Sequence, residues 1–166
     1  MGISSYDAAS TREAEAILRS AGVPLLVHQP AYSLLNRGIE AELLPALEEL
    51  GVGCVIFSPL AQGVLTRKYL GGIPAESRAA TSRFLDQAAI TPQVLKAVRR
   101  LDELAQARGQ SLAQMAVAWT LRNPVVTSAI IGARNVQQLD ETLAALENLA
   151  FSATELAAIE HALAGV

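Results

Sequence analysis

Phe57-Ser58-Pro59-Leu60-Ala61-Gln62-Gly63 is the stretch that decides the fold, because an apolar run that begins at residue 54 stops there abruptly in polar and glycine residues. The stretch Ser128-Ala129-Ile130-Ile131-Gly132-Ala133-Arg134 repeats this pattern, and Gln138-Leu139-Asp140-Glu141 follows it closely. Buried strands have this pattern where they open onto a ligand, since parallel α/β sheets bind ligands beyond the carboxyl ends of their strands. The two stretches therefore predict a binding site built from two strand ends.

Strand and helix patterns alternate along the chain. Short apolar runs predict strands at 25–29, 54–57 and 127–131, and residues 2–5 predict the end of an earlier strand. Because the connecting loops are short, the alternation predicts right-handed parallel βαβ units. Residues 58–90 break the pattern and predict one long functional or mobile loop. Helices are predicted at 10–22, 40–50, 91–109, 111–123 and 135–147, and from 152 onward.

Three of the helix starts carry a capping-box pattern. In such a box, a serine and a glutamate or glutamine three residues later bond each other's backbone amides. Gly51 is predicted to end the helix at 40–50 in a left-handed conformation. The predicted boxes are Ser10 with Glu13, Ser111 with Gln114, and Ser152 with Glu155.

Composition narrows the class of protein. A chain of 166 residues with 51% hydrophobic and 17% charged residues predicts one globular domain with a real core. The net charge of -3 and the absence of a basic block argue against a nucleic-acid partner. The single cysteine, Cys54, and the lack of a signal or membrane-span pattern predict a cytoplasmic protein with no membrane partner. Two distant histidines and one cysteine predict no metal site.

Four stretches together resemble the aldo-keto reductases, within the branch related to potassium-channel β-subunits and bacterial glyceraldehyde-phosphate reductases. Two of them are the strand ends quoted above, and the others are residues 2–6 (Gly-Ile-Ser-Ser-Tyr) and 28–37 (His-Gln-Pro-Ala-Tyr-Ser-Leu-Leu-Asn-Arg). The resemblance implies an α/β fold, the C-terminal half of a (β/α)8 TIM barrel with about four parallel strands and surrounding helices. Residues 1–166 would form a single partial domain that begins at the fifth strand of the barrel.

The resemblance also implies the cofactor NADP (NADPH) and a set of binding residues. Ser4 and Gln29 match the residues that hold the nicotinamide carboxamide, and Phe57 matches the aromatic ring that stacks on the nicotinamide. At Thr142 the channel-subunit branch usually has asparagine against the adenine, so the chain departs from that branch at one adenine contact. The other matching residues are Ser58, Leu60 and Gln62 around the pyrophosphate, Lys68 and Arg78 in the covering loop, and Gly132, Arg134, Gln138 and Glu141 around the adenosine and its 2′-phosphate.

Taken singly, these residues have simpler interpretations. Phe57 fits a core aromatic, and Arg134 and Glu141 fit solvated helix charges, so only their shared order and spacing carry the resemblance. His28 precedes Gln29 on a predicted strand, which turns its side chain to the opposite face and predicts a structural role. Cys54 is expected to be a small buried hydrophobe rather than a nucleophile.

The family's catalytic groups have no matching positions in this chain. They are a tyrosine that donates the proton, a lysine and an aspartate that tune it, and a histidine that orients the substrate, and all lie on the first four strands of the family barrel. We therefore expect the chain to be the cofactor-binding half of an NADPH-dependent oxidoreductase that reduces small aldehydes or ketones. The alternatives are a non-catalytic NADP-binding adaptor or regulatory subunit, or an inactive truncated product.

A half-barrel leaves two strand edges without neighbours. The predicted strands at 2–6 and 127–131 would form these edges, and Leu26, Val55, Ile56 and Ile130, or their neighbours, would be uncovered. The mean hydropathy of +0.31 fits a chain with an uncovered apolar face. We therefore expect self-association, or pairing with the missing N-terminal half, and a small carbonyl substrate in the complete barrel.

Overall fold

A four-stranded parallel sheet forms the centre of the fold. The computed structural model describes residues 1–81 and 85–166, and within them the strands lie in the order β1-β2-β3-β4. Each neighbouring pair is parallel, as the alternation of strands and helices predicts. The strands are β1 (Gly2–Ser4), β2 (Val27–Gln29), β3 (Gly53–Phe57) and β4 (Val126–Ile130).

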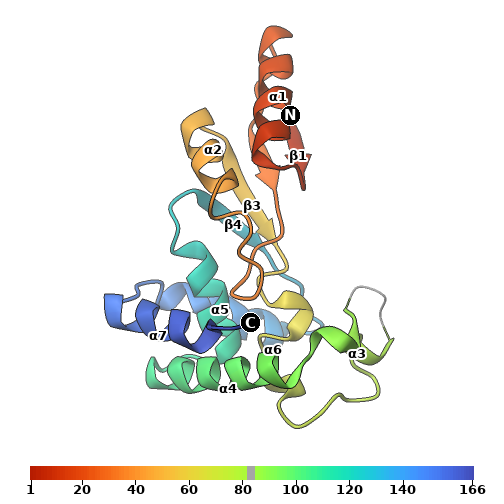
Figure 1. Cartoon of the computed structure of the whole chain (residues 1–166), viewed down its shortest axis with the longest axis vertical. Helices are drawn as coiled ribbons and strands as arrows, with labels where there is room; N and C mark the ends of the chain where they lie inside the picture. The colour runs from red at the N-terminus through yellow and green to blue at the C-terminus, as the bar shows by residue number, and fades with distance from the viewer. Residues whose placement is uncertain (82–84) are drawn as a thin grey trace.

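Helices follow or separate these strands. In Figure 1, α1 and α2 lie beside the strands toward one end of the molecule, and α4, α5 and α7 gather at the other. The α/β class with four parallel strands is confirmed. The helices are α1 (Ala8–Ser20), α2 (Leu43–Leu50), α3 (Arg78–Thr81), α4 (Pro92–Ala107), α5 (Leu112–Leu121), α6 (Val136–Leu143) and α7 (Ala153–Leu163).

The predicted long loop at 58–90 contains short helical turns. The described part of the loop includes α3 and the short turns η1 (Ala61–Gly63), η2 (Arg67–Tyr69) and η3 (Gln87–Ala89). Outside the loop, a further turn, η4 (Ala144–Glu147), continues α6. The loop nevertheless carries several buried apolar side chains into the core, such as Val64, Leu65 and Tyr69. It therefore belongs to the packed part of the protein.

Two of the three predicted capping boxes are confirmed. Ser111 and Ser152 each accept from the backbone of the residue three positions later, whose side chain accepts in return. The box predicted at Ser10 is wrong, because α1 starts two residues earlier and Asp7 is its N-cap. The Asp7 carboxylate accepts from the Ser10 amide at 2.7 Å, so Ser10 is inside the first turn. Gly51 ends α2 with φ 67°, as predicted.

The two faces of the sheet differ in burial. Along β3, Cys54 and Ile56 are fully buried, whereas Val55 and Phe57 on the opposite face are partly exposed. The prediction that Ile56 is uncovered is therefore wrong, because its side chain points into the core under the helices. Leu26 and Ile130 are 60% and 44% exposed, which confirms that part of the apolar surface is open.

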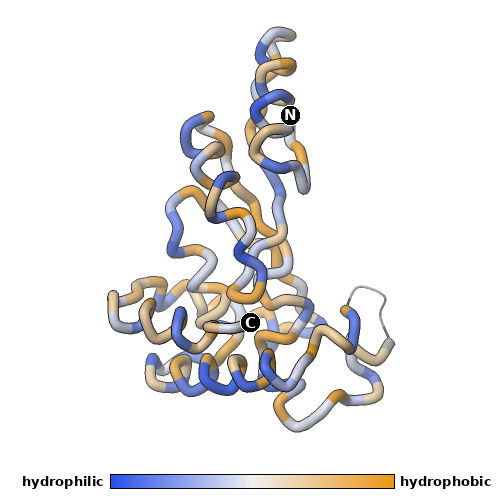
Figure 2. Tube along the Cα trace, viewed as in Figure 1, coloured by the Kyte–Doolittle hydropathy of each residue, from blue (hydrophilic) through white to orange (hydrophobic). Residues whose placement is uncertain are grey.

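The core lies between the covered face of the sheet and the helices. Trp119 of α5 is its largest fully buried side chain, and α5 buries seven of its ten residues. Helix α4 contacts both α5 and α7. Hydrophilic and hydrophobic residues alternate along α4 in Figure 2, as expected of a helix with one face on the core and one in solvent.

His28 lies on the covered face, opposite to Gln29, as predicted. Its side chain is fully buried, and its Nε2 lies 3.1 Å from the carbonyl oxygen of Tyr6. Burial lowers the pKa of His28, and the bond to Tyr6 opposes that effect less strongly. The imidazole is therefore neutral in the folded protein at neutral pH.

This burial predicts a loss of stability in mild acid. Between the lowered folded-state pKa and the unfolded value near 6.5, the unfolded chain takes up a proton that the folded chain does not. The free energy of unfolding should therefore fall as pH drops below about 6.5, by at most about 1.4 kcal/mol per pH unit for this one group. Denaturant unfolding followed by circular dichroism measures the slope.

The variant His28→Gln should flatten the slope between pH 6.5 and 5 even if it lowers stability overall. His161→Gln is the matched control, because His161 is exposed on α7. A slope that survives in His28→Gln would contradict the assignment.

Candidate functional site

A groove of about 840 Å³ lies at the carboxyl ends of β3 and β4. The first turns of α5 and α6 and the turns that follow β3 complete its walls. Ligand sites usually have volumes of this order and lie at the carboxyl ends of parallel strands. The lining residues are Phe57, Ser58, Pro59, Leu60, Gln62, Gly63, Thr66, Arg67, Lys68, Ser111, Leu112, Ala113, Ile130, Ile131, Gly132, Arg134, Gln138, Glu141 and Thr142.

Most of the predicted binding residues meet in this groove. Ser4 and Gln29 lie outside its lining, at the carboxyl ends of β1 and β2. Arg78 begins α3, and its side chain lies outside the described part of the structure. The predicted residues that do line the groove are Phe57, Ser58, Leu60, Gln62, Lys68, Gly132, Arg134, Gln138 and Glu141.

Ser4, Gln29 and Phe57 share one face of the sheet. Ser4 is the register partner of Gln29, and its Oγ donates to the Gln29 carbonyl at 2.9 Å. Phe57 pairs with Ile130 of β4 and lies on the face opposite the buried Ile56. The three side chains therefore follow the open face from β1 to β3 toward the groove.

The strand ends at this face hold strained backbone. Within residues 1–81 and 85–166, the non-glycine residues with positive φ are Ser5, Ser58, Ala61 and Gln62, with φ between 46° and 60°. All four follow β1 or β3 directly or within a few residues. The left-handed region costs an L-residue roughly 1–2 kcal/mol, and such strain concentrates at ligand sites. The Gln62 Nε2 donates to the Ser58 Oγ at 2.8 Å, which ties the strained turn together.

The first turn of α6 forms the far wall of the groove. Asn135 is the N-cap and its Oδ1 accepts from the Gln138 amide at 2.9 Å. The Gln138 Oε1 accepts in turn from the Arg134 amide at 3.0 Å. These bonds fix the backbone around Arg134, whose side chain is exposed. A guanidinium beside a helix N-terminus favours an anionic ligand.

The groove also contains residues that the sequence did not indicate. Ser111, Leu112 and Ala113 bring the N-terminus of α5 to the groove. The capping box at Ser111 is the signal that could have suggested this, since it marks a helix start with free amides. Arg67 also lines the groove, but its Nε donates to both carboxylate oxygens of the mostly buried Asp102 at 2.8 and 3.0 Å. Arg67 is thereby tied to α4.

Cys54 is a core residue, as expected. It is fully buried, and burial raises the pKa of its thiol to about 11. A thiol with that pKa is protonated at neutral pH and is a poor nucleophile.

Within residues 1–81 and 85–166, no group of three or more His, Cys, Asp or Glu residues is placed to hold a metal ion. In the same part of the chain, none of the helices has the length and apolar character that crossing a membrane requires.

Comparisons with known proteins place the chain in a family. The model of the aldo/keto reductase family matches residues 1–164, so the chain belongs to the aldo/keto reductases. It is 48% identical over 169 residues to the L-glyceraldehyde 3-phosphate reductase of Escherichia coli (strain K12), an alignment that covers 99% of this chain and 49% of that protein. The fold is therefore half of the family's barrel.

More distant relatives cover less of the chain. A probable voltage-gated potassium channel subunit beta of Oryza sativa subsp. japonica is 42% identical over 126 residues, which are 74% of this chain and 38% of that protein. An uncharacterized oxidoreductase of Bacillus subtilis (strain 168) is 41% identical over 123 residues, 74% of this chain and 36% of that protein. The chain thus spans about half the length, or less, of the curated relatives it matches.

The strained strand ends predict an unusual response to glycine. Replacing Ser5, which is exposed and has φ 60°, with glycine should raise the free energy of unfolding by about 0.5–1 kcal/mol, because glycine adopts this conformation without strain. The bond from the residue 5 amide to the Gln29 carbonyl stays available. Ala16→Gly in the exposed middle of α1 is the control and should lower stability by about 0.5–1 kcal/mol. Destabilisation by both changes in chemical denaturation would contradict the strain at Ser5.

Proposed function

We propose that this chain is the NADP(H)-binding half of an aldo/keto reductase that reduces small aldehydes. The observation that carries the proposal is the groove, whose lining contains both the Phe57 ring at a strand end and Arg134 beside the start of a helix. An apolar ring and cationic groups in one groove suit a ligand with a flat ring and phosphates. NADP(H) has both parts, and when bound it would supply the hydride.

Residues in the groove and at the neighbouring strand end fit such a ligand in three ways. Phe57 offers a flat apolar face on which an aromatic ring can stack. The amide of Gln29, at the adjacent strand end, can both donate to and accept from a carboxamide. Lys68 and Arg134 are exposed and, among the described residues, form no ion pair with a carboxylate, so their charges are available for phosphate. The volume of about 840 Å³ lies in the range of small-molecule and cofactor sites.

In this proposal, the role of the chain itself is to bind NADP(H) and to orient its nicotinamide. The proton donor and its neighbours belong, by family resemblance, to the other half of the barrel, so reduction would require that half.

The name of the Escherichia coli relative makes glyceraldehyde 3-phosphate the first aldehyde to test. The second candidate function is NADP(H) binding without turnover, favoured by the similarity to a channel subunit beta. An NADPH oxidation assay on the chain joined to a family N-terminal half separates the two.

Cofactor preference tests the assignment of Arg134. NADPH should bind the chain more tightly than NADH, and Arg134→Ala should weaken NADPH binding by roughly 1.5–3 kcal/mol, the usual contribution of hydrogen bonds to charged groups. This change is roughly ten- to a hundredfold in affinity. Binding of NADH should change much less, because NADH lacks the 2′-phosphate. The fluorescence of the reduced nicotinamide measures both affinities.

Arg19→Ala is the control, because Arg19 is an exposed arginine on α1 and its partner is Glu15. Equal losses for NADPH and NADH in Arg134→Ala would mean that Arg134 does not contact the 2′-phosphate. An absence of binding of either nucleotide to the wild-type chain would contradict the proposed function.

We also propose that two copies of the chain associate. The outer edges of β1 and β4 have no neighbouring strand within the described residues. In the segment that follows β4, the apolar side chains of Val136, Leu139, Leu143 and Leu146 are 40–72% exposed along α6 and η4. Open edges and apolar surfaces of this kind favour association. Pairing β1 of each copy with β4 of the other would close eight parallel strands around a twofold axis.

Light scattering and sedimentation test the association. The wild-type chain should be a dimer or a larger species at micromolar concentration. Replacing Leu139 and Leu143 with lysine should weaken the dimer at least about tenfold, because two charges would enter an apolar contact. Glu103→Lys on the exposed side of α4 is the control for a charge change elsewhere. A compact wild-type monomer with a sharp cooperative melt would contradict the proposal.

A further inference from the structure

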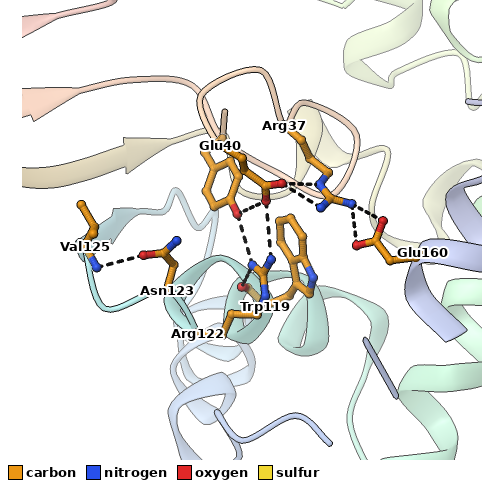
Figure 3. A network of polar contacts seen from close by, with 8 residues as sticks. Arg37, Glu40, Trp119, Arg122, Asn123, Val125 and Glu160 are labelled. Carbon is orange, nitrogen blue, oxygen red and sulfur yellow. Dashed lines mark hydrogen bonds and ion pairs between the residues drawn. The ribbon is translucent and has the colours of Figure 1, made fainter. Parts of the chain in front are cut away.

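A half-buried carboxylate, Glu40, lies at the centre of a polar network that joins the loop between β2 and α2 to α5 and α7 (Figure 3). Its Oε2 accepts from the Nε and Nη2 of Arg37 at 2.9 and 2.7 Å. Its Oε1 accepts from the Tyr32 hydroxyl at 2.5 Å and lies 3.5 Å from the Nη2 of Arg122. Burial alone would raise the pKa of Glu40, but the bonds from Arg37 and Tyr32 outweigh it and lower the pKa. Glu40 is therefore an ionised acceptor for all three partners.

The partners of Glu40 are fixed to the helices of the core. Arg37 also donates to both carboxylate oxygens of Glu160 on α7, each at 2.7 Å. Arg122, at the C-cap of α5, donates to the Trp119 carbonyl at 2.8 Å and stacks 3.8 Å from the centre of the Trp119 ring. The loop from β2 to α2 is thus attached to both α5 and α7, and Figure 3 shows the side chains converging from these elements.

Tyr32 connects this network to the groove. Its side chain is fully buried, with the ring 5.2 Å from that of Trp119 and the hydroxyl also accepting from Arg122 at 3.1 Å. Its backbone amide donates to the carbonyl of Phe57 at 3.2 Å, and the Phe57 amide donates to the Pro30 carbonyl at 2.9 Å. Tyr32, which the network restrains, is therefore hydrogen-bonded directly to the backbone of Phe57.

Phe57 needs such support because the next residue is strained. Ser58 has φ 58°, and residues in this region persist only where the surrounding structure determines them. Gln29 immediately precedes Pro30, so the same short segment also contains the residue that is predicted to bind the nicotinamide carboxamide. The strand β3 ends at Phe57, where the bonds to Pro30 and Tyr32 lie on one side and the pairing with β4 lies on the other.

We infer that Glu40 is a positioning residue, which acts through Tyr32 to fix Phe57 and Gln29 at the nicotinamide end of the groove. This inference rests on the proposed binding of NADP(H). Glu40 and Tyr32 do not line the groove. Arg134, Gln138 and Glu141, which are proposed to hold the adenosine end of the ligand, are on α6 and the loop before it and have no bond to the network among the described residues. The two ends of the ligand should therefore respond differently to the loss of Glu40.

Two ligands distinguish the ends. NADPH reaches both, whereas 2′-phospho-ADP-ribose has the adenosine 2′-phosphate and the pyrophosphate but no nicotinamide. In Glu40→Gln and Tyr32→Phe, affinity for NADPH should fall about tenfold while affinity for 2′-phospho-ADP-ribose stays within about twofold of wild type. Titration calorimetry measures both ligands in the same way. Glu49→Gln, which breaks the exposed ion pair with Arg12, is the matched control.

Hydrogen exchange tests the positioning without any ligand. Both network variants should speed exchange of the Tyr32 and Phe57 amides, and exchange in the middle of α4 should keep its wild-type rate. Tyr32→Phe removes one hydroxyl and keeps the buried ring, so it reports even if Glu40→Gln folds poorly. Equal loss of both ligands, or unchanged exchange at Tyr32 and Phe57, would overturn the inference. If the wild-type chain binds neither ligand, the proposed function fails, and the exchange rates alone decide whether the network fixes Phe57.

Discussion

Parallel pairing of β3 with β4 is the constraint on which the groove depends. The pairing sets Phe57 beside Ile130, although more than seventy residues separate them in the chain. Because the two strands are parallel, their carboxyl ends lie at the same end of the sheet, and the loops that follow them must lie side by side there. The intervening residues include α4 and α5, and they return the chain with the first turn of α5 at the same edge. Topology, more than local sequence, therefore assembles the site.

Local sequence nevertheless predicted much of the fold. The alternation of elements, the stop at Gly51 and the caps at Ser111 and Ser152 depend on short-range bonds, which a single sequence displays directly. The start of α1 was misplaced because both Asp7 and Ser10 are good capping residues, and only the folded backbone selects between them. The exposure of Ile56 was misjudged because strands of parallel sheets are apolar on both faces, so the pattern does not reveal which face the helices cover.

The site was predictable to the extent that it lies in contiguous motifs. Most of the residues matched to the family converge on one groove because they follow two neighbouring strand ends. The N-terminus of α5 was not anticipated, because its approach to the groove is a tertiary event. The Glu40 network was missed for a similar reason. Its members come from the loop before α2 and from the ends of α5 and α7, and no spacing in the sequence links Arg37 to Glu160.

The open face of the sheet would couple the proposed cofactor binding to the proposed association. Phe57 and Ile130 lie on this face, and the apolar surface beside them is exposed to water. A ring stacked on Phe57 would be wetted on its outer side unless another strand or a second copy covers the face, and hydride transfer is favoured by excluding water. The proposed adenosine end would have no such dependence, because Arg134 and the first turn of α6 are exposed, and a helix N-terminus favours phosphate without being closed off from water. If the chain binds NADP(H) as proposed, a half-barrel would keep its contacts to the phosphate groups, while the nicotinamide end would depend on a second copy or another strand that covers the open face.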